Sequence, residues 1–300
     1  MPFESPSAWR AARSFHHSRY GEAGLSGRED SISVCLPARE CAATIGPIVE
    51  ALVGLRERGA IDQLVVVDGS SRDATARIAA EAGATVHGEE ELMAGYGPVL
   101  GKGDAMWRAL SVLDGDLVCF LDADVRDFSP HYALGLLGPL VEFDEIAFVK
   151  AFYRRPFRHG EMVLADGGGR VTHLLARPAL AIFYPALAAV GQPLAGEIAA
   201  RRSLLERLPF TTGYGVEIAM LLDVLDAVGL DGIAQVDLDS RENSHQPLLD
   251  LSAMSYAVLK VLAERLEREG RLLELEPGPL LLGERTMDPP LLERPPMVRA

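Results

Sequence analysis

Two carboxylates, Asp122 and Asp124, follow a run of apolar and β-forming residues that begins after Gly115. The run contains no proline, which is typical of a strand buried on both faces. Side chains alternate along a strand, so the two carboxylates would share one face if strand geometry continues that far. Open α/β sheets hold ligands at the carboxyl ends of their strands, where Asp-x-Asp suits Mg²⁺ or Mn²⁺ bridging a diphosphate. An isolated Asp-x-Asp is more often a solvated acidic turn, so the other motifs must decide between that interpretation and a metal site.

The elements that must position this pair alternate between strands and helices. Strands are expected at residues 31–36, 63–67 and 84–87, and helices at residues 44–58 and from residue 74. Pro37 is expected to end the first strand, and a Ser or Asp of the turn 68–73 to cap the second helix. This order predicts an α/β fold with a doubly wound, mostly parallel sheet.

The second half continues the alternation with less regularity. A strand is expected at 148–153 and another at 235–238, with helices at 174–189, from 192, from 214 and at 250–268. The tail from Pro277 holds six prolines in 24 residues, so we expect it to be irregular or to pack across an oligomer interface.

Two glycine-rich stretches could receive phosphate groups. Gly101-Lys102-Gly103 precedes a helix, where backbone can approach a phosphate and Lys102 offers a charge. Three glycines followed by Arg170 and Thr172 form a second candidate cradle for an oxyanion. A flexible loop and a structural hinge, respectively, are the structural alternatives.

Charge and composition narrow the function classes. The formal net charge of −14 disfavours nucleic acid and anionic membranes. Between Lys150 and Arg177, however, six basic residues stand against two acidic ones, which suits an anionic substrate. No apolar run reaches membrane-spanning length, the start lacks a signal-peptide core, and three unpaired cysteines indicate reduced thiols, so a cytoplasmic protein is expected. The pair His16-His17 could bind metal, but it is assigned to an arm on the body rather than to the site.

Together these stretches resemble the GT-A glycosyltransferases, and more closely the retaining glucosyl-3-phosphoglycerate and actinobacterial mannosyl-3-phosphoglycerate synthases. The resemblance covers about residues 31–260. It rests on the Asp68-Gly-Ser-Ser turn, Asp-x-Asp, and residues 98–108 (PVLGKGDAMWR), 149–156 (VKAFYRRP), 167–172 (GGGRVT), 175–178 (LARP), 192–197 (QPLAGE), 208–210 (LPF) and 213–218 (GYGVEI).

The resemblance implies a division of the chain into an N-terminal arm at 1–30, a nucleotide-sugar-binding half at 31–130, an acceptor-binding half of the same GT-A domain at 131–268, and a proline-rich tail at 269–300. The implied donor-binding residues are Pro37, Ala38, Asp68, Gly69, Lys102, Asp122, Ala123, Tyr214, Glu217 and Arg241. The implied acceptor-binding residues are Gly168, Gly169, Arg170 and Thr172. The residues implied at the reaction centre are Asp124, Glu217, Leu194 and Lys102.

A metal, Mg²⁺ or Mn²⁺, is implied on Asp124 and a histidine. Relatives carry Arg-x-His-x-Asn before a Pro-Leu, whereas this chain has Arg241-Glu-Asn243-Ser-His245. We assign His245 as the second ligand because imidazole binds metal better than an amide. The first loop also departs from Pro-Ala-x-Asn-Glu, since Pro37-Ala38 is followed by Arg-Glu-Cys.

The implied reaction moves glucose from UDP-glucose to the 2-hydroxyl of 3-phosphoglycerate with retention. The resemblance also implies a homodimer. Front-side attack assisted by the leaving diphosphate is favoured over a double displacement, with Glu217 orienting the sugar. GDP-mannose as donor, a lipid phosphate as acceptor, a nucleotidyltransferase, and a nucleotide-sugar-binding protein without activity stay open as alternatives.

Overall fold

The computed structural model describes residues 3–159, 162–164, 168–241, 248–272, 280–282, 285–287 and 292–297. Within them one large sheet has the strand order β1-β11-β6-β9-β5-β2-β3-β4. Its strands are β1 Ser14–His16, β2 Ile32–Ala38, β3 Gln63–Asp68, β4 Thr85–Gly88, β5 Leu117–Phe120, β6 Phe148–Arg154, β9 Ile198–Arg201 and β11 Ile233–Ser240. The strands pair in parallel except β9, which runs antiparallel to both β5 and β6. The predicted fold class is confirmed.

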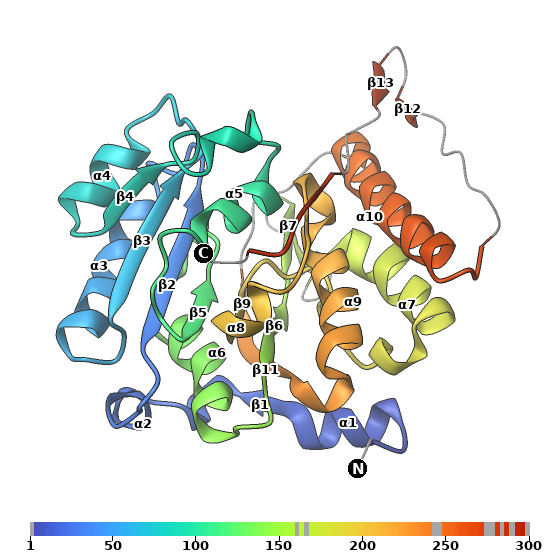
Figure 1. The fold of residues 1–300 in the computed structure, drawn as a ribbon, viewed down its shortest axis with the longest axis horizontal. Coiled ribbons are helices and arrows are strands. Elements are labelled where there is room, and N and C mark those ends of the chain that lie inside the picture. The colour runs from blue at the N-terminus through green and yellow to red at the C-terminus, as the bar shows by residue number, and fades with distance from the viewer. Residues whose placement is uncertain are drawn as a thin grey trace.

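Helices cover both faces of this sheet (Figure 1). Their bounds are α1 Pro6–Arg13, α2 Glu22–Ser26, α3 Ile45–Glu57, α4 Thr75–Glu81, α5 Lys102–Ala109, α6 His131–Glu142, α7 Arg177–Phe183, α8 Arg202–Leu205, α9 Val216–Val228 and α10 Leu248–Arg268. The buried side chains of α3 and α6 belong to one apolar cluster, and those of α5, α9 and α10 to another. The alternating side chains of strand β3 separate the two clusters: Val65 and Val67 belong to one, while Leu64 and Val66 belong to the other.

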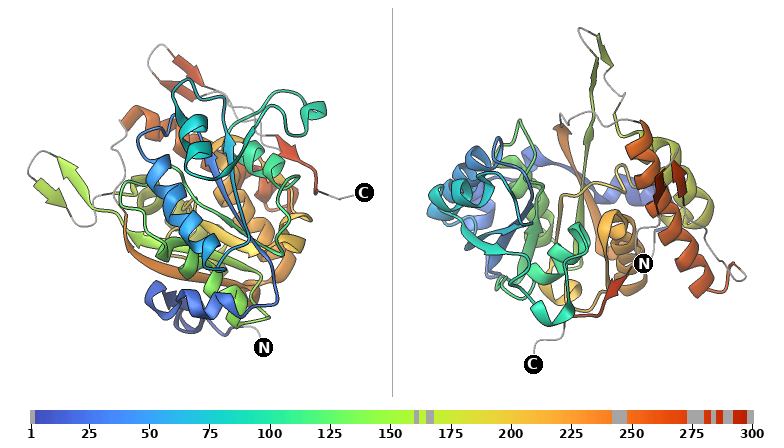
Figure 2. Two further views of the ribbon diagram at one scale, coloured as in Figure 1. Left: turned by 90° about the vertical axis from the view of Figure 1, so that its left-hand side faces the viewer. Right: turned by 90° about the horizontal axis from the view of Figure 1, so that it is seen from above.

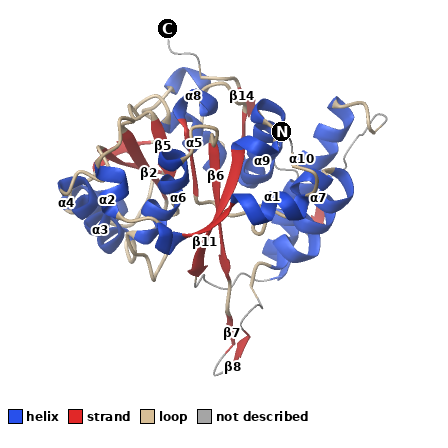
Figure 3. Ribbon diagram, turned by 90° about the horizontal axis from the view of Figure 1, so that it is seen from below, coloured by secondary structure: helices blue, strands red, loops and turns tan. Residues whose placement is uncertain are grey.

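Three short antiparallel pairs accompany the sheet. They are β7 Phe157–His159 with β8 Met162–Leu164, β10 Phe210–Thr211 with β14 Glu293–Arg294, and β12 Leu280–Leu282 with β13 Arg285–Met287. The β7–β8 hairpin extends away from the body at the end of β6 (Figures 2 and 3). Among the described residues, no helix has the length and apolar character needed to cross a membrane.

The antiparallel strand β9 corrects one prediction and explains how the site is built. We expected a helix from residue 192, but residues 192–197 form turns that lead into β9. Because β9 runs against its neighbours, its amino-terminal end lies at the edge where the parallel strands have their carboxyl ends. Residues just before β9 therefore meet those just after β5, β6 and β11.

Several predicted bounds were also wrong. Pro37 does not end β2, which continues to Ala38 beside Asp68 of β3. The strand before Asp122 ends at Phe120, so the Asp-x-Asp pair lies in a turn. Helix α4 begins at Thr75 with Ala74 at its N-cap position, and the expected Asp lies one residue earlier, where Asp73 Oδ1 accepts from the Thr75 N–H at 2.9 Å. The expected helix at 174–189 is a π-helical turn at Thr172–Ala176, then α7 and a 3₁₀ turn at Pro185–Leu187.

Both ends of the chain pack on the body. In the N-terminal segment, β1 joins the sheet beside β11, and the buried Trp9 indole donates a hydrogen bond to the Ile233 carbonyl at 2.9 Å. In the tail, β14 pairs with β10, and Arg294 forms an ion pair with the buried Asp104 at 2.7 Å. Residues 292–297 are thus ordered on their own chain, unlike the irregular or intersubunit tail that we expected. The four-part division of the chain stays a prediction.

Candidate active site

The turn that carries the two carboxylates is anchored by neighbouring elements. The Leu121 N–H donates to the Cys35 carbonyl at 3.0 Å, which extends the β2–β5 contact by one residue. The Thr44 hydroxyl, at the start of α3, donates to the Ala123 carbonyl at 2.6 Å. Asp122 and Asp124 therefore hold defined positions although they lie beyond the strand.

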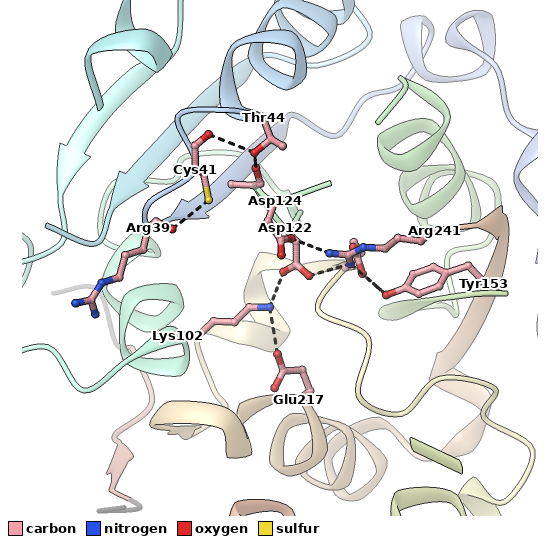
Figure 4. A network of polar contacts seen from close by, with 11 residues as sticks. Arg39, Cys41, Thr44, Lys102, Asp122, Asp124, Tyr153, Glu217 and Arg241 are labelled. Atoms are coloured by element: carbon pink, nitrogen blue, oxygen red, sulfur yellow. Dashed lines mark hydrogen bonds and ion pairs between the residues drawn. The ribbon is translucent and has the colours of Figure 1, made fainter. Parts of the chain in front are cut away.

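A buried arginine joins the two carboxylates (Figure 4). Arg241 follows β11 and is 1% exposed. Its Nη1 donates to Asp122 Oδ2 and its Nη2 to Asp124 Oδ1, each at 2.9 Å. Nη1 also contacts Glu197 Oε1, and the Tyr153 hydroxyl donates to Glu197 Oε2 at 2.9 Å. One guanidinium thus bridges three carboxylates from two different loops.

A lysine approaches the same pair from the opposite side (Figure 4). Lys102 is the first residue of α5, and its Nζ lies 2.6 Å from Asp122 Oδ1 and 3.1 Å from Glu217 Oε1. Glu217 is in the first turn of α9. Five predicted site residues therefore lie in one network: Lys102, Asp122, Asp124, Glu217 and Arg241.

The charges of this network support one another. Burial alone would raise the pKa of Asp122, but Lys102 and Arg241 outweigh it and hold that pKa well below its usual range. Burial would likewise lower the pKa of Lys102, but Asp122 and Glu217 raise it above its usual range. Both groups are therefore charged at neutral pH, with a cation available beside a bound diphosphate.

Asp122→Asn is expected to reduce the free energy of unfolding by about 3 kcal/mol at pH 7, because it leaves the buried Arg241 and the partly exposed Lys102 less compensated. A carboxyl group with a depressed folded-state pKa stabilises the fold above its unfolded pKa of about 4, and this contribution is lost as pH falls further. Urea unfolding from pH 7 down to pH 3 should show the difference between the two proteins shrinking below pH 4. A difference that stays constant with pH would contradict the assignment.

Gly196 lets these groups meet. A Cβ at this position would lie 2.2 Å from Lys102 Nζ and 2.5 Å from Asp122 Oδ1. Gly196→Ala is therefore expected to push Lys102 and Asp122 apart and to lower kcat/KM about 100-fold, since small misplacements at a reaction centre are costly. The atoms displaced are side-chain ends, so the melting temperature should change little. Gly95→Ala, at an open position, is the matched control and should keep full activity.

A second group of predicted residues lies at the ends of β2 and β3. Ala38 pairs with Asp68, and the Gly69 N–H donates to the Ala38 carbonyl at 2.7 Å. Asp68 is 8% exposed; its Oδ2 accepts from the Ser71 N–H at 3.0 Å, while its Oδ1 has no partner among the described residues. A buried acceptor in need of an N–H donor fits the base of a nucleotide.

The predicted acceptor residues form the start of the π-helical turn. The Gly168 N–H donates to the Arg155 carbonyl at 2.9 Å, and a Cβ at Gly168 would lie 2.7 Å from that oxygen. Gly169 has φ +66°, and Thr172 is buried. The Arg155 guanidinium lies 5.6 Å from the centre of the Tyr153 ring, and Arg241 lies at the same distance from it. Tyr153 thus connects the glycine-rich turn with the carboxylate network.

The positions of the remaining predicted residues give less information about their roles. Leu194 is partly buried in the turn before β9, and Tyr214 is exposed in a 3₁₀ turn before α9. His245 and Asn243 lie outside the described residues, so the choice between them stays a prediction. Lys150 should not be counted among the basic residues that face an anionic substrate, because it is 1% exposed and donates to the Ala195 carbonyl at 2.8 Å. Burial lowers its pKa to about 8.

Glu197, Tyr153 and Gly196 are site residues that the sequence analysis did not name individually. All three lie within the stretches on which the family resemblance rests, residues 149–156 and 192–197. That clustering was the only signal in the sequence. Glu197 is fully buried, and burial raises its pKa while Arg241 opposes the shift.

The exposed face of the network fits a divalent cation. The Asp124 side chain is 57% exposed and uses Oδ1 for its bond to Arg241. Carboxylate oxygens at an accessible edge are the ligands that Mg²⁺ and Mn²⁺ prefer. Asp124 can therefore contribute to a metal site.

Comparisons with known proteins agree with this geometry. Residues 33–163 match the family model described as glycosyl transferase family 2. The chain is 39% identical to glucosyl-3-phosphoglycerate synthase of Petrotoga mobilis, over 95% of this chain and 93% of that protein. It is 46% identical in sequence to the crystal structure of mannosyl-3-phosphoglycerate synthase from Rubrobacter xylanophilus, with a TM-score of 0.90 over 99% of this chain and 98% of that one.

A second similar structure contains ligands. Glucosyl-3-phosphoglycerate synthase from Mycobacterium tuberculosis, in complex with Mn²⁺, UDP-glucose and phosphoglyceric acid, is 42% identical, with a TM-score of 0.79 and 92% of each chain covered. A divalent metal accompanies the nucleotide sugar in that relative. The chain is therefore a glycosyltransferase, and it belongs to glycosyl transferase family 2, among the glucosyl- and mannosyl-3-phosphoglycerate synthases.

Proposed function

We propose that this enzyme transfers glucose from UDP-glucose to the 2-hydroxyl of 3-phosphoglycerate and retains the anomeric configuration. The observation that carries the proposal is the network of Lys102, Asp122, Asp124 and Arg241 at the carboxyl edge of the sheet. The ligands of the similar M. tuberculosis enzyme support the choice of donor and acceptor. The phosphate and carboxylate of the acceptor also suit a basic glycine-rich turn.

In this proposal the ends of β2 and β3 hold the nucleoside. Pro37, Ala38, Asp68 and Gly69 line that position, and the free Oδ1 of Asp68 accepts from the base. Asp122 and Ala123 hold the ribose side of the donor, while Lys102 offers its charge to the diphosphate. Gly168, Gly169, Arg170 and Thr172 bind the acceptor.

Asp124 and His245 would hold Mg²⁺ or Mn²⁺, which supplies positive charge against the diphosphate that departs. Arg241 keeps the Asp124 carboxylate oriented, since it donates to Oδ1. Lys102, beside Asp122, would add a second positive charge next to the diphosphate.

The protein's task in the transfer is mainly positioning. Glu217 is ion-paired with Lys102, so we assign it to orienting the sugar together with Tyr214, rather than to nucleophilic attack. The backbone near Leu194 lies along the reaction face in this proposal. The acceptor hydroxyl then attacks on the face that the diphosphate leaves, and a diphosphate oxygen takes its proton.

Product formation tests the proposal. The enzyme is incubated with 3-phosphoglycerate and Mg²⁺, with UDP-glucose and GDP-mannose in parallel. We expect turnover with UDP-glucose, and NMR of the product should show the donor's anomeric configuration. GDP-mannose is the second candidate, because the similar R. xylanophilus structure is a mannosyl-3-phosphoglycerate synthase.

Other outcomes would replace the proposal. Faster turnover of GDP-mannose would make the enzyme a mannosyl transferase. Metal-dependent hydrolysis of the donor without transfer to 3-phosphoglycerate would indicate another acceptor, such as a lipid phosphate. Nucleotide binding without any turnover would indicate a binding protein.

Arg170→Ala is expected to raise the KM for 3-phosphoglycerate at least tenfold, because a guanidinium binds phosphate or carboxylate through charge-assisted hydrogen bonds. The KM for UDP-glucose should change little. The control is Arg207→Ala, because Arg207 is an exposed arginine two residues after the end of α8. An unchanged acceptor KM in the Arg170 variant would remove the glycine-rich turn from the acceptor site.

We also propose a cytoplasmic homodimer. Light scattering on the purified protein tests the dimer, and cell fractionation tests the location. A monomer at micromolar concentration would overturn the first part.

A further inference from the structure

A second cluster of ligand-type side chains lies at the same edge of the sheet, at the ends of β1 and β11. His16 Nε2 lies 3.2 Å from Asp239 Oδ1, and His17 Nε2 lies 2.7 Å from Asp239 Oδ2. The possible ligand atoms of these three residues all lie within 4.8 Å of one another. The glycosyltransferase reaction proposed above uses none of them.

The backbone brings these side chains to one point by two departures from regular strand geometry. Adjacent strand residues face opposite sides, but β1 ends at His16 and a 3₁₀ turn begins at His17, so the two rings lie 4.5 Å apart. On β11 the register shifts between Asp237 and Ser240, and Asp239 adopts φ +68°. Both departures occur where the cluster forms.

Neighbouring groups hold the two imidazoles. His16 Nδ1 accepts from the Ser18 N–H at 3.2 Å and also lies 2.8 Å from the Ser18 hydroxyl oxygen. With a metal on Nε2 the ring proton would move to Nδ1, and the Ser18 hydroxyl could then accept it in place of the N–H contact. His131, at the start of α6, packs its ring 4.2 Å from that of His17. The His17 side chain is 17% exposed, whereas those of His16 and Asp239 are about half exposed, so an ion can enter from solvent.

We propose that His16, His17 and Asp239 form a binding site for a divalent transition metal, most suitably Zn²⁺. Two imidazoles and one carboxylate are a ligand set that zinc accepts, with water at the fourth position. Tetrahedral zinc with ligands at about 2.0–2.1 Å separates ligand atoms by about 3.3 Å. The 3.2 Å between His16 Nε2 and Asp239 Oδ1 already matches, whereas the 2.7 Å between His17 Nε2 and Asp239 Oδ2 must widen slightly. All three ligand atoms lie within 4.8 Å of one another, so small rotations of the rings and the carboxylate would close the site.

This site is distinct from the Mg²⁺ or Mn²⁺ site at Asp124. Its imidazole ligands favour zinc over magnesium, while the oxygen ligands of the donor site favour magnesium or manganese. A metal here would tie the N-terminal segment to β11 two residues before Arg241. It would therefore hold the strand end from which Arg241 reaches the carboxylates.

Zinc titration tests the inference, on protein without a histidine tag and without nucleotide. A chromophoric chelator reports the affinity and the number of bound ions. An Asp124→Asn background weakens the donor-side metal site and leaves the cluster intact. We expect one tightly bound Zn²⁺ per chain, which is lost in His16→Gln/His17→Gln and in Asp239→Asn. His87→Gln, in β4, is the matched control and should keep the full stoichiometry.

Two further measurements separate a built site from surface histidines. Co²⁺ in place of Zn²⁺ should give the intense visible bands of tetrahedral coordination, and the same variants should lose them. Zn²⁺ should also raise the melting temperature of the parent protein but not of Asp239→Asn, whose φ an asparagine tolerates. Equal zinc stoichiometry in the parent and the cluster variants, with each variant folded by circular dichroism, would overturn the proposal.

Discussion

Asp124→Ala is expected to lower kcat/KM about 1,000-fold, equivalent to about 4 kcal/mol of transition-state stabilisation. Asp124 is the half-exposed carboxylate of the network, so it is the member that can meet a metal on the donor. Initial rates with UDP-glucose and 3-phosphoglycerate, at saturating and at limiting Mn²⁺, measure the effect. Most of the loss should persist at saturating metal, because the variant lacks the carboxylate that would hold the ion beside the diphosphate.

The control for this variant lies three residues further on. Asp127 is also an exposed carboxylate of the loop before α6. Asp127→Ala should retain nearly full activity, which would separate the loss of a ligand from a change in local charge. If Asp127→Ala lost as much activity as Asp124→Ala, the metal assignment would fail.

Arg241→Met is expected to impair both stability and catalysis. Arg241 is buried and bridges Asp122, Asp124 and Glu197, so its removal leaves the buried Glu197 without a cation and Asp122 with Lys102 alone. Breaking a buried ion pair in this way costs about 3–5 kcal/mol of unfolding free energy. Urea unfolding measures that cost, and steady-state kinetics should show at least a 100-fold loss of kcat/KM because the donor-side carboxylates lose their orientation.

A second substitution tests the cause. Glu197→Gln removes one buried negative charge, and it should restore part of the stability lost in Arg241→Met. In the parent protein the same change should be destabilising, because it weakens the bond to Arg241. Arg241→Lys keeps the charge but not the planar set of N–H donors, so its stability should lie between those of the parent protein and Arg241→Met. Equal effects of Glu197→Gln in both backgrounds would show that the two residues do not interact.

The strands and helices of the first half could be predicted because their signals are local. Apolar runs that end in turns placed β2 and β3 to within two residues, and helical periodicity placed α3. Strand β9 was missed for the opposite reason. It is four residues long, and only its neighbours β5 and β6 stabilise it as an antiparallel strand. A short apolar segment does not show which partner it will have.

The site shows the same limit. The residue types at Lys102, Asp122, Asp124 and Glu217 indicated phosphate and metal chemistry, and the family motifs marked their neighbourhood. Neither showed that Gly196 would lie against Lys102, or that Lys150 of β6 would be buried and donate to the Ala195 carbonyl instead of meeting an anion. Those contacts join residues far apart in the chain.

The sequence by itself determined the fold class and the family, and it indicated which residues to propose for binding a metal and a diphosphate, because periodicity and motif spacing are properties of short stretches. The tertiary structure alone decided how these residues share their charges. Arg241 lies more than a hundred residues from Asp122, and only the parallel order of β5, β6 and β11 brings their ends to one edge. The same order places His16 beside Asp239. Long-range strand pairing, which no local pattern encodes, thus assembled both sites.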